Sequence, residues 1–142
     1  MQELIQNIQA ILCKPQLSAL ATVTPDGKPW VRYVMTVGNA DMVIRCATFT
    51  DARKVEQIRL NPEVHLTCGV TDPMTMSPYL QIQGRARLTT DEAERHAFWN
   101  PMLARVFATP DNPKYGILVI EAYRIEYCVP PAHTPEVWTR EH

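Results

Sequence analysis

Hydrophobic and polar positions follow two different periods in the first third of the chain. Residues 3–12 carry apolar side chains three to four positions apart, the spacing of one helix face, and Lys14-Pro15 ends this segment. Beyond it, short runs rich in apolar and β-branched residues are separated by turn-forming proline, glycine, asparagine and aspartate. These runs occupy residues 17–24, 29–37 and 42–47. The pattern predicts a helix followed by an antiparallel meander.

The strand pattern returns in the second half of the chain. Strands are predicted at residues 64–70, 79–88 and 116–129, with a loop at 71–78. Over 79–88 the alternation is regular, because small or apolar residues occupy one face of the strand. The polar residues of the other face are Gln81, Gln83, Arg85 and Arg87. A polar face this regular is either solvated or meets a polar interface.

A second helical region is predicted after this strand. Thr89 and Glu92 match a capping box, in which a threonine caps the helix and a glutamate follows at the third helical position. Asn100-Pro101 interrupts the helix. Its apolar face consists of Phe98, Trp99, Met102, Leu103, Val106 and Phe107. Aromatic residues in such a stripe more often belong to the core. Trp99 therefore has two possible roles, as a core residue or as a ligand contact.

Six predicted strands with short turns and few helices indicate a mainly β fold. We expect a single domain over residues 1–142, an antiparallel six-stranded, Greek-key-like β-barrel with peripheral helices. Residues 130–142 form a polar, proline-rich C-terminal tail in which Trp138 is the large apolar residue. Trp138 is therefore expected to dock on another surface, such as that of a partner subunit.

The segment 48–64 is predicted to form a short helix between two strands. Thr48, Thr50 and Asp51 each offer a side-chain oxygen that can cap the helix start by accepting a bond from a backbone N–H group. Asn61-Pro62 ends the helix, because proline disfavours helical geometry in the residue before it.

Arg53 and Lys54 are unusual in the first turn of this helix. A cation there lies at the positive end of the helix dipole, at a cost of about 0.3–1 kcal/mol. A bound anion would reverse the sign of that interaction, because free N–H groups, hydroxyls and two cations together suit a phosphate group. Two interpretations stay open: solvated charges on a connecting helix, or a phosphate site.

The predicted strand at 29–37 has apolar residues on both faces, so neither face is plainly solvated. Arg32 interrupts it. A lone arginine on a strand more often extends its guanidinium into water. The functional alternative is that Arg32 reaches an anion beside the sheet.

Composition excludes several classes of function. The chain has 142 residues, 46% of them hydrophobic, with a formal net charge of -1 and a pI of about 6.4, so no basic excess indicates a nucleic-acid partner. No apolar run approaches the length of a membrane span, and no signal peptide is apparent, so a cytoplasmic protein is expected. The cysteines and histidines lack the spacing of a metal site, and no metal is expected.

The ordered elements resemble the flavin-binding split barrels of the pyridoxamine 5′-phosphate oxidase-like family, and most closely its short, general-stress-protein-type members. The resemblance covers about Leu4 to Cys128. The segments that carry it are residues 17–29, Trp30 to Val37, Thr48 to Val64 through Arg53-Lys54, and Ile82 to Leu88, with further likeness at 98–101 and 125–127.

The resemblance implies an FMN site and a homodimer with its sites at the subunit interface. In the family, basic residues of the second strand and of the following helix hold the flavin phosphate. The matching residues here are Arg32, Arg53 and Lys54, with Thr48 nearby. The flavin ring of the family lies along the second strand, which implies contacts from Tyr33, Val34, Met35 and Thr36. Tyr79 matches the contact that a partner strand supplies.

Three departures from the family pattern limit what the resemblance implies. Ala52 stands where the family often has a serine before the basic pair, so one phosphate hydroxyl is missing. Val37 stands near the place where full-length oxidases carry a further basic residue. Their C-terminal substrate-binding segment is not recognisable, so oxidation of vitamin B6 phosphates is not expected.

The expected function is therefore that of a flavin-dependent oxidoreductase that uses FMN with a small-molecule electron donor or acceptor. One alternative is a non-catalytic flavin-binding or general-stress module. Another is a binder of a deazaflavin or haem in the same cleft. No residue is identified as catalytic, since Tyr33 and His65 qualify only because they can titrate or donate a proton.

Overall fold

The computed structural model describes residues 1–70, 72–75 and 77–141 of the chain. Positions 71 and 76 of the predicted 71–78 loop, and His142, lie outside the described residues. The helices are α1 (Gln2–Leu12), α2 (Arg53–Leu60), α3 (Glu92–Phe98) and α4 (Pro101–Phe107). The strands are β1 (Gln16–Val23), β2 (Pro29–Gly38), β3 (Val43–Phe49), β4 (Glu63–Cys68), β5 (Tyr79–Thr89), β6 (Tyr115–Cys128) and β7 (Glu136–Thr139).

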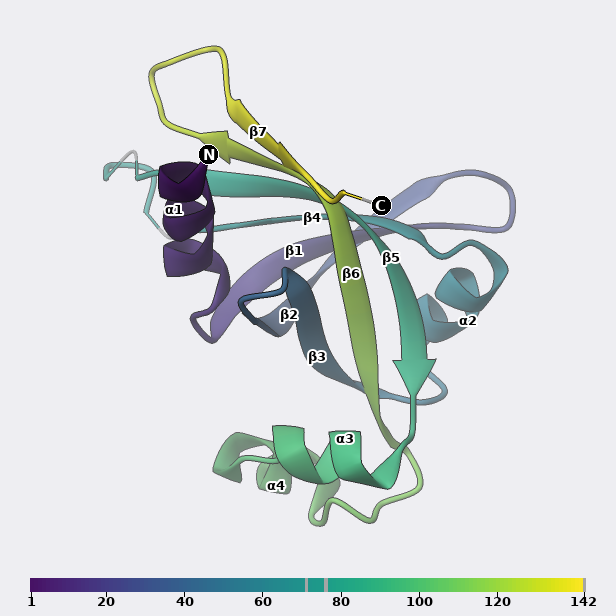
Figure 1. The fold of residues 1–142 in the computed structure, drawn as a ribbon. Helices are drawn as coiled ribbons and strands as arrows, with labels where there is room; N and C mark the ends of the chain where they lie inside the picture. Colours follow the sequence, from purple (N-terminus) through teal and green to yellow (C-terminus); the bar gives the residue numbers. More distant parts are fainter. Residues whose placement is uncertain (71, 76, 142) are drawn as a thin grey trace.

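Strands β1 to β6 form a closed antiparallel barrel, as the sequence predicts (Figure 1). The order along the sheet is β3-β2-β1-β4-β5-β6-β7, and an additional pairing of β3 with β6 closes it. Strand β4 lies beside β1 rather than beside β3, which is the arrangement of a Greek key. Helices α3 and α4 lie at one end of the barrel, and α1 lies against its side (Figure 1).

The barrel is split between β2 and β3. These strands are joined only where Val37 pairs with Arg45 and Gly38 with Ile44. Below that point β3 continues to pair with β6 as far as Phe49, while β2 continues to pair with β1 as far as Pro29. The two strands therefore diverge, and side chains that face the gap are not covered by a neighbouring strand.

The interior contains one main hydrophobic core and one small one. The main core combines the inward residues of β1 to β6 with Leu4, Ile8 and Leu12 of α1. Helix α1 fits closely because Gly38 has no side chain: a Cβ at that position would lie 2.5 Å from Leu12 Cγ. The small cluster lies where α3 and α4 meet the barrel, around Tyr115 and Phe107. Its aromatic rings connect the helices to β6.

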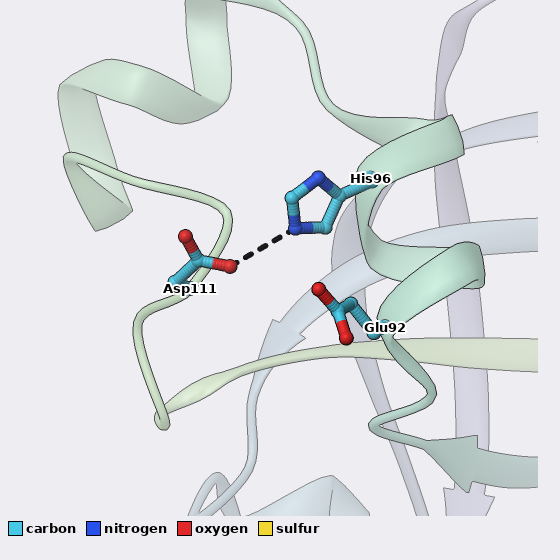
Figure 2. Close-up of side chains that lie close together, drawn as sticks. All are labelled: Glu92, His96 and Asp111. Carbon is cyan, nitrogen blue, oxygen red and sulfur yellow. Dashed lines mark hydrogen bonds and ion pairs between the residues drawn. The ribbon is translucent and has the colours of Figure 1, made fainter.

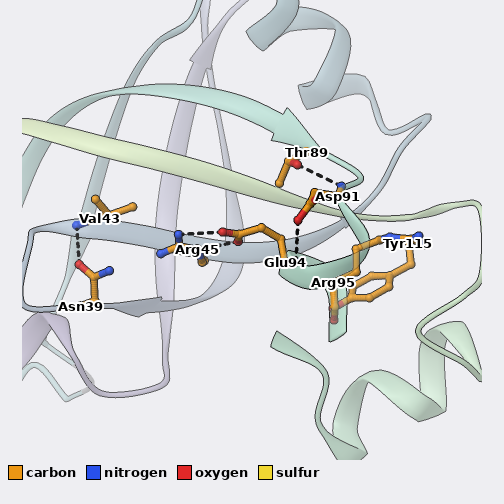
Figure 3. Close-up of polar contacts among 8 residues, drawn as sticks. All are labelled: Asn39, Val43, Arg45, Thr89, Asp91, Glu94, Arg95 and Tyr115. Carbon is orange, nitrogen blue, oxygen red and sulfur yellow. Dashed lines mark hydrogen bonds and ion pairs between the residues drawn. The ribbon is translucent and has the colours of Figure 1, made fainter. Parts of the chain in front are cut away.

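The predicted caps of α2 and α3 are wrong. The N-cap residue of α2 is Ala52, which has no side-chain oxygen, and the Thr48 hydroxyl instead donates to the carbonyl of Phe49. At α3 the N-cap is Asp91, whose carboxylate accepts from the N–H of Glu94 at 3.1 Å (Figure 3). Thr89 cannot cap a helix because it still belongs to β5, where it pairs with Ile117.

The C-terminal tail contains a strand that the sequence does not predict. Strand β7 pairs with the end of β6, so that Trp138 lies opposite Ile125. Trp138 does dock, and the surface it packs against is the main core of its own chain. Strand β7 has four residues, which is too short to show a clear alternation of apolar and polar positions. It also follows a proline-rich segment, a composition that indicates a loop rather than a strand.

Among the described residues, no helix is both long enough and apolar enough to cross a membrane.

Candidate functional site

A cleft of about 520 Å³ opens where β2 and β3 diverge. Its first wall is β2 from Tyr33 to Val37, and its second is the end of β3 from Ala47 to Phe49. Helix α4 and the residues just before it form the third wall. The apolar side chains from this helical region are Phe98, Met102, Leu103, Val106 and Phe107. The cleft therefore offers an apolar slot between a strand and a short helix, a shape that suits a flat ring.

Helix α4 is held in place at its start by its own sequence. Pro101 occupies the first turn, and the Asn100 side-chain oxygen accepts from the N–H groups of Met102 and Leu103 at 3.0 and 3.2 Å. Met102 and Val106 remain 57% and 54% exposed although they are apolar. Their exposure on the cleft side leaves apolar surface available for contact with a ligand.

Lys54 and Thr48 lie at the cleft, together with four of the predicted ring contacts. The residues that the structure brings to this one surface are Tyr33, Val34, Met35, Thr36, Thr48 and Lys54. Lys54 comes from the first turn of α2, and burial lowers the pKa of its amine. It lies near Cys46, whose own burial raises the pKa of that thiol to about 11. Cys46 is therefore a neutral thiol near neutral pH and does not compensate the lysine.

Arg32 does not extend into water, and it forms no ion pair within the described residues. Its guanidinium donates to Thr22 Oγ1 at 2.7 Å, to the Trp30 carbonyl at 3.1 Å and to Gln57 Oε1 at 3.3 Å. All of these acceptors are neutral, so the charge of Arg32 stays uncompensated. Burial lowers the Arg32 pKa, and Arg53 lowers it further by charge repulsion.

Gln57 is a buried polar residue that the sequence analysis does not single out. It lies on the inner face of α2, where its Oε1 accepts from the Thr22 hydroxyl at 2.5 Å and from Arg32. The amide thus connects α2 to β1 and β2 and fixes the direction of the Arg32 side chain. One glutamine among the charged residues of a short helix gives no periodic signal, so the pattern could not have identified it.

Arg53, Arg32 and Lys54 form a group of three cations. The Arg53 guanidinium lies 5.3 Å from the centre of the Trp30 ring, and Arg32 is close enough to Lys54 to lower the lysine pKa, after burial. None of the three forms an ion pair within residues 1–70, 72–75 and 77–141. Uncompensated cations beside an apolar slot fit a ligand that has an anionic group and a flat apolar body.

Four predicted site residues do not line this cleft: Arg32 and Arg53, whose contacts are given above, and Tyr79 and Trp99. Tyr79 lines a second hollow of about 360 Å³, which shares Tyr33 with the main cleft. Trp99 packs edge-on against Tyr115, with ring centres 5.4 Å apart, in the small hydrophobic cluster. Within one chain, Trp99 therefore has the core role that its helical spacing favours.

The α4 residues of the cleft wall were assigned to a helical core stripe in the sequence analysis. The break at Asn100-Pro101 is the sequence signal that could have distinguished these cleft residues from core residues. A helix of seven residues carrying Met102, Leu103, Val106 and Phe107 has more apolar surface than its length can bury in a core. Phe107 is buried in the small core and Val106 is exposed, yet both line the cleft, so the same stripe contributes to core and cleft.

Glu92, His96 and Asp111 form a separate surface cluster on α3 and the following loop (Figure 2). Their ligand atoms lie within 4.8 Å of one another, and His96 Nε2 is 3.0 Å from Asp111 Oδ1. This cluster was not identified in the sequence analysis, although Glu92 and His96 lie about one helical turn apart in the chain. All three side chains are exposed and none lines the main cleft. We assign no metal to them.

The fold and the gap between β2 and β3 place the molecule in the class of split barrels. A family model described as pyridoxamine 5′-phosphate oxidase matches residues 4–128. The chain belongs to this family, as the ordered sequence segments predict.

Two similar proteins are general stress proteins. General stress protein 26 of Bacillus subtilis (strain 168) is 31% identical over 120 residues, which is 84% of each chain. The crystal structure of General Stress Protein 26 from Bacillus anthracis str. Sterne superposes with a TM-score of 0.85 at 28% identity, covering 97% of this chain and 99% of that one. The similarity therefore extends over the barrel and its helices.

Two further solved structures are named for the cofactors they use. One is described as an F420 reductase, with 26% identity and a TM-score of 0.63 over 82% of this chain and 94% of its own. The other, from Nostoc punctiforme PCC 73102, is described as an FMN-binding protein related to pyridoxamine 5′-phosphate oxidase. It has 18% identity and a TM-score of 0.63, covers 88% of this chain and 81% of its own, and is similar in fold alone.

Proposed function

We propose that this protein binds FMN in the cleft between β2, β3 and α4 and acts as a flavin-dependent oxidoreductase. The observation that carries the proposal is that Lys54 lines an apolar cleft and belongs to a group of uncompensated cations with Arg32 and Arg53. Membership of the pyridoxamine 5′-phosphate oxidase family supports the choice of FMN. The proposal excludes oxidation of vitamin B6 phosphates, because the substrate-binding segment of those oxidases is not recognisable here.

Lys54 and Arg53 would hold the phosphate of FMN. Their position in the first turn of α2 costs stability in the free protein, because both oppose the helix dipole. A phosphate in front of the helix would be attracted by the cations and by the dipole together. Arg32 would add a third positive charge, and its side chain is oriented by hydrogen bonds to Gln57 and Thr22.

The apolar walls would hold the flavin ring. Strand β2 offers its backbone from Tyr33 to Thr36, and α4 faces it with Met102, Leu103 and Val106. These side chains would exclude water from one face of the ring and leave the outer face for a second reactant. A bound flavin would supply the hydride or electron transfer, for which no protein side chain is a substitute.

We also propose that the protein is a homodimer in which Tyr79 completes the site of the second copy. The exposed face of β1 and β2 supports this, because it presents Leu17, Val31, Tyr33 and Met35 to solvent. Contiguous apolar side chains on a sheet face are typical of an interface. Tyr79 lines the hollow next to Tyr33, at the margin of this same face.

The first test is the visible spectrum of the purified protein, repeated after FMN is added and the excess removed. Retained flavin bands would support the proposal, and a colourless protein that retains no FMN would contradict it. Lys54→Ala and Arg53→Ala should each weaken binding by roughly tenfold to a hundredfold, the value of one charge-assisted bond. Arg59→Ala is the matched control, since Arg59 lies on the same helix and, among the described residues, forms its ion pair with Glu56.

Turnover separates an enzyme from a passive flavin carrier. The FMN complex, mixed anaerobically with NADH or NADPH, should lose its oxidised-flavin absorbance and regain it when an acceptor is added. A complex that stays oxidised with both donors would support a non-catalytic flavin-binding module instead. The similarity to an F420 reductase makes a deazaflavin the second candidate, and titration with a deazaflavin in place of FMN tests it directly.

A further inference from the structure

A second cleft, of about 470 Å³, lies on the outer face of the barrel and shares no lining residue with the first. It covers the surface of β3, β6 and β5 and reaches the C-terminal segment after β7. Its charged and aromatic lining residues are Arg45, Arg85, Arg87, Arg140, Glu121 and Tyr123. Four arginines thus face one glutamate, in a chain whose net charge is -1.

Strand register brings these side chains together. Arg45 on β3 and Arg87 on β5 both pair with Val119 of β6, so the two arginines flank one valine. In the next row on the same face, Arg85 pairs with Glu121. Directly opposed residues of neighbouring strands share one face of a sheet, which places three of the arginines over the same surface.

A β-bulge supplies the aromatic residue of the cleft. Gln83 pairs with Arg124 and Gly84 with Ala122, so Tyr123 has no partner on β5. Gly84 permits this close approach of the strands, because a Cβ there would lie 2.9 Å from the Glu121 carbonyl oxygen. The Tyr123 ring then lies under Arg85, whose guanidinium carbon is 5.1 Å from the ring centre.

Two of the arginines act as fixed walls. Arg45 donates two hydrogen bonds to the Glu94 carboxylate, at 2.9 and 3.1 Å, across the gap to α3 (Figure 3). Arg140 donates to the carbonyls of Ala122 and Asp41, both at 2.8 Å. These contacts hold each end of the cleft in position. The donors that make them are already occupied, so they are not available to a ligand.

The other two arginines remain available. Arg87 is exposed and forms no ion pair within the described part of the chain. The pKa of Glu94 is lowered mainly by its hydrogen bond with Arg45, and the charge of Arg87 lowers it further. Arg85 pairs with Glu63 at 3.0 Å, but the two side chains are 65% and 43% exposed. Such a surface pair contributes little and exchanges readily with a stronger acceptor.

We propose that this cleft binds a small anion carrying two or more negative charges on phosphate groups. Two neighbouring guanidinium groups on one strand can each bind a phosphate with paired N–H bonds, which a lysine cannot do. The volume suits a small molecule rather than a polymer, and the chain lacks the basic excess of a nucleic-acid binder. This proposal does not depend on the FMN site.

Calorimetric titration with inorganic pyrophosphate at constant ionic strength tests the proposal. Arg85→Gln combined with Arg87→Gln should weaken binding by roughly tenfold or more, because each removes a charge-assisted donor. Arg105→Gln combined with Arg59→Gln is the matched control for the loss of two surface charges. Both altered positions of the cleft are exposed, so circular dichroism should show an unchanged fold.

Pyrophosphate could also bind to the group formed by Arg32, Arg53 and Lys54, because it is a phosphate anion. Binding there must be distinguished from binding in the second cleft. Arg53→Gln combined with Lys54→Gln should leave the binding that depends on Arg85 and Arg87 intact. Pyrophosphate binding that is lost in that variant and retained without Arg85 and Arg87 would overturn the proposal, as would no binding to the unaltered protein. A polyglutamate peptide that binds with the same arginine dependence while pyrophosphate does not would assign the cleft to an acidic protein partner instead.

Discussion

At the scale of single residues, the Arg32 guanidinium is held by neutral oxygens only. Gln57 and Thr22 provide two of them, and both side chains are buried. A partly buried cation without a carboxylate partner is costly unless an anion compensates it from elsewhere. The arrangement therefore has the property of a site prepared for a negatively charged ligand.

Gln57→Leu should lower the free energy of unfolding by about 1–3 kcal/mol, because Thr22 and Arg32 lose a buried acceptor. It should also weaken FMN binding, since Arg32 loses its fixed direction. Urea denaturation and FMN titration measure the two effects. Glu56→Gln, on the exposed side of the same helix, should change neither by a comparable amount. Equal stability of the Leu variant and the unaltered protein would show that Gln57 does not hold Arg32.

Lys54→Met should weaken FMN binding by roughly tenfold to a hundredfold and yet stabilise the free protein by about 0.3–1 kcal/mol, since it removes a cation from the positive end of α2. The folded state lowers the Lys54 pKa, so the unfolded chain binds more protons between the folded and unfolded pKa values. The contribution of Lys54 to stability therefore improves as the pH rises through that window. Denaturation midpoints should converge at high pH, and a constant difference from pH 7 upward would contradict this account.

At the scale of elements, the cleft depends on one short helix that tertiary contacts hold only in part. Helix α4 has seven residues and buries Phe107 as its one fully covered side chain. Helices of this length are not stable by themselves, so the Asn100 cap contributes an important part of the order. The third wall of the cleft is thus the least stable one.

Asn100→Ala should cost about 0.5–2 kcal/mol, as the loss of an N-cap does elsewhere. The effect should be local, with faster amide hydrogen exchange over residues 101–107 than over the barrel strands. Asp51→Ala is the matched control, because Asp51 was a candidate cap by sequence but caps nothing in the structure. A uniform increase in exchange over the whole barrel would instead assign Asn100 a role in global stability.

The elements also show what the sequence could predict and where it could not. Alternating residues identified the paired strands, since burial on one face leaves a clear period. Helix caps depend on where the preceding strand stops pairing, and Thr89 is held in β5 by Ile117, which lies far along the chain. Strand β7 and the contacts of Gln57 likewise arise from tertiary structure, which no local pattern carries. The helix dipole and the strand pattern made the three cations candidates for an anion site, whereas only the family resemblance made the β2 residues candidates for a ring contact.

At the scale of the whole molecule, the exposed apolar face of β1 and β2 is the feature that a single copy leaves unexplained. Val31 is 68% exposed and Tyr33 74% exposed, although both lie in the middle of a strand. Alternation along β2 therefore separates an apolar outer face from a buried inner one. We expect that outer face to be covered in solution by a second copy.

Val31→Glu should convert the dimer to monomers, because a charge in an apolar interface has no partner. Light scattering with size-exclusion chromatography measures the mass, and the variant should keep its barrel by circular dichroism. Leu60→Glu, at the exposed end of α2, controls for adding a charge to a surface apolar residue. A monomeric mass for the unaltered protein at micromolar concentration would contradict the interface.

The pairing of β3 with β6 has a consequence for synthesis of the protein in the cell. The barrel closes only when residues 43–49 meet residues 115–121, and Arg140 then donates to the Asp41 carbonyl from 99 positions away. A ribosome must therefore release the residues of β6 as far as Glu121 before the barrel can close. Until then the edge of β3 stays unpaired, and such edges join other chains. Newly made molecules should need chaperone protection throughout translation, and folding should be slow for a protein of this size.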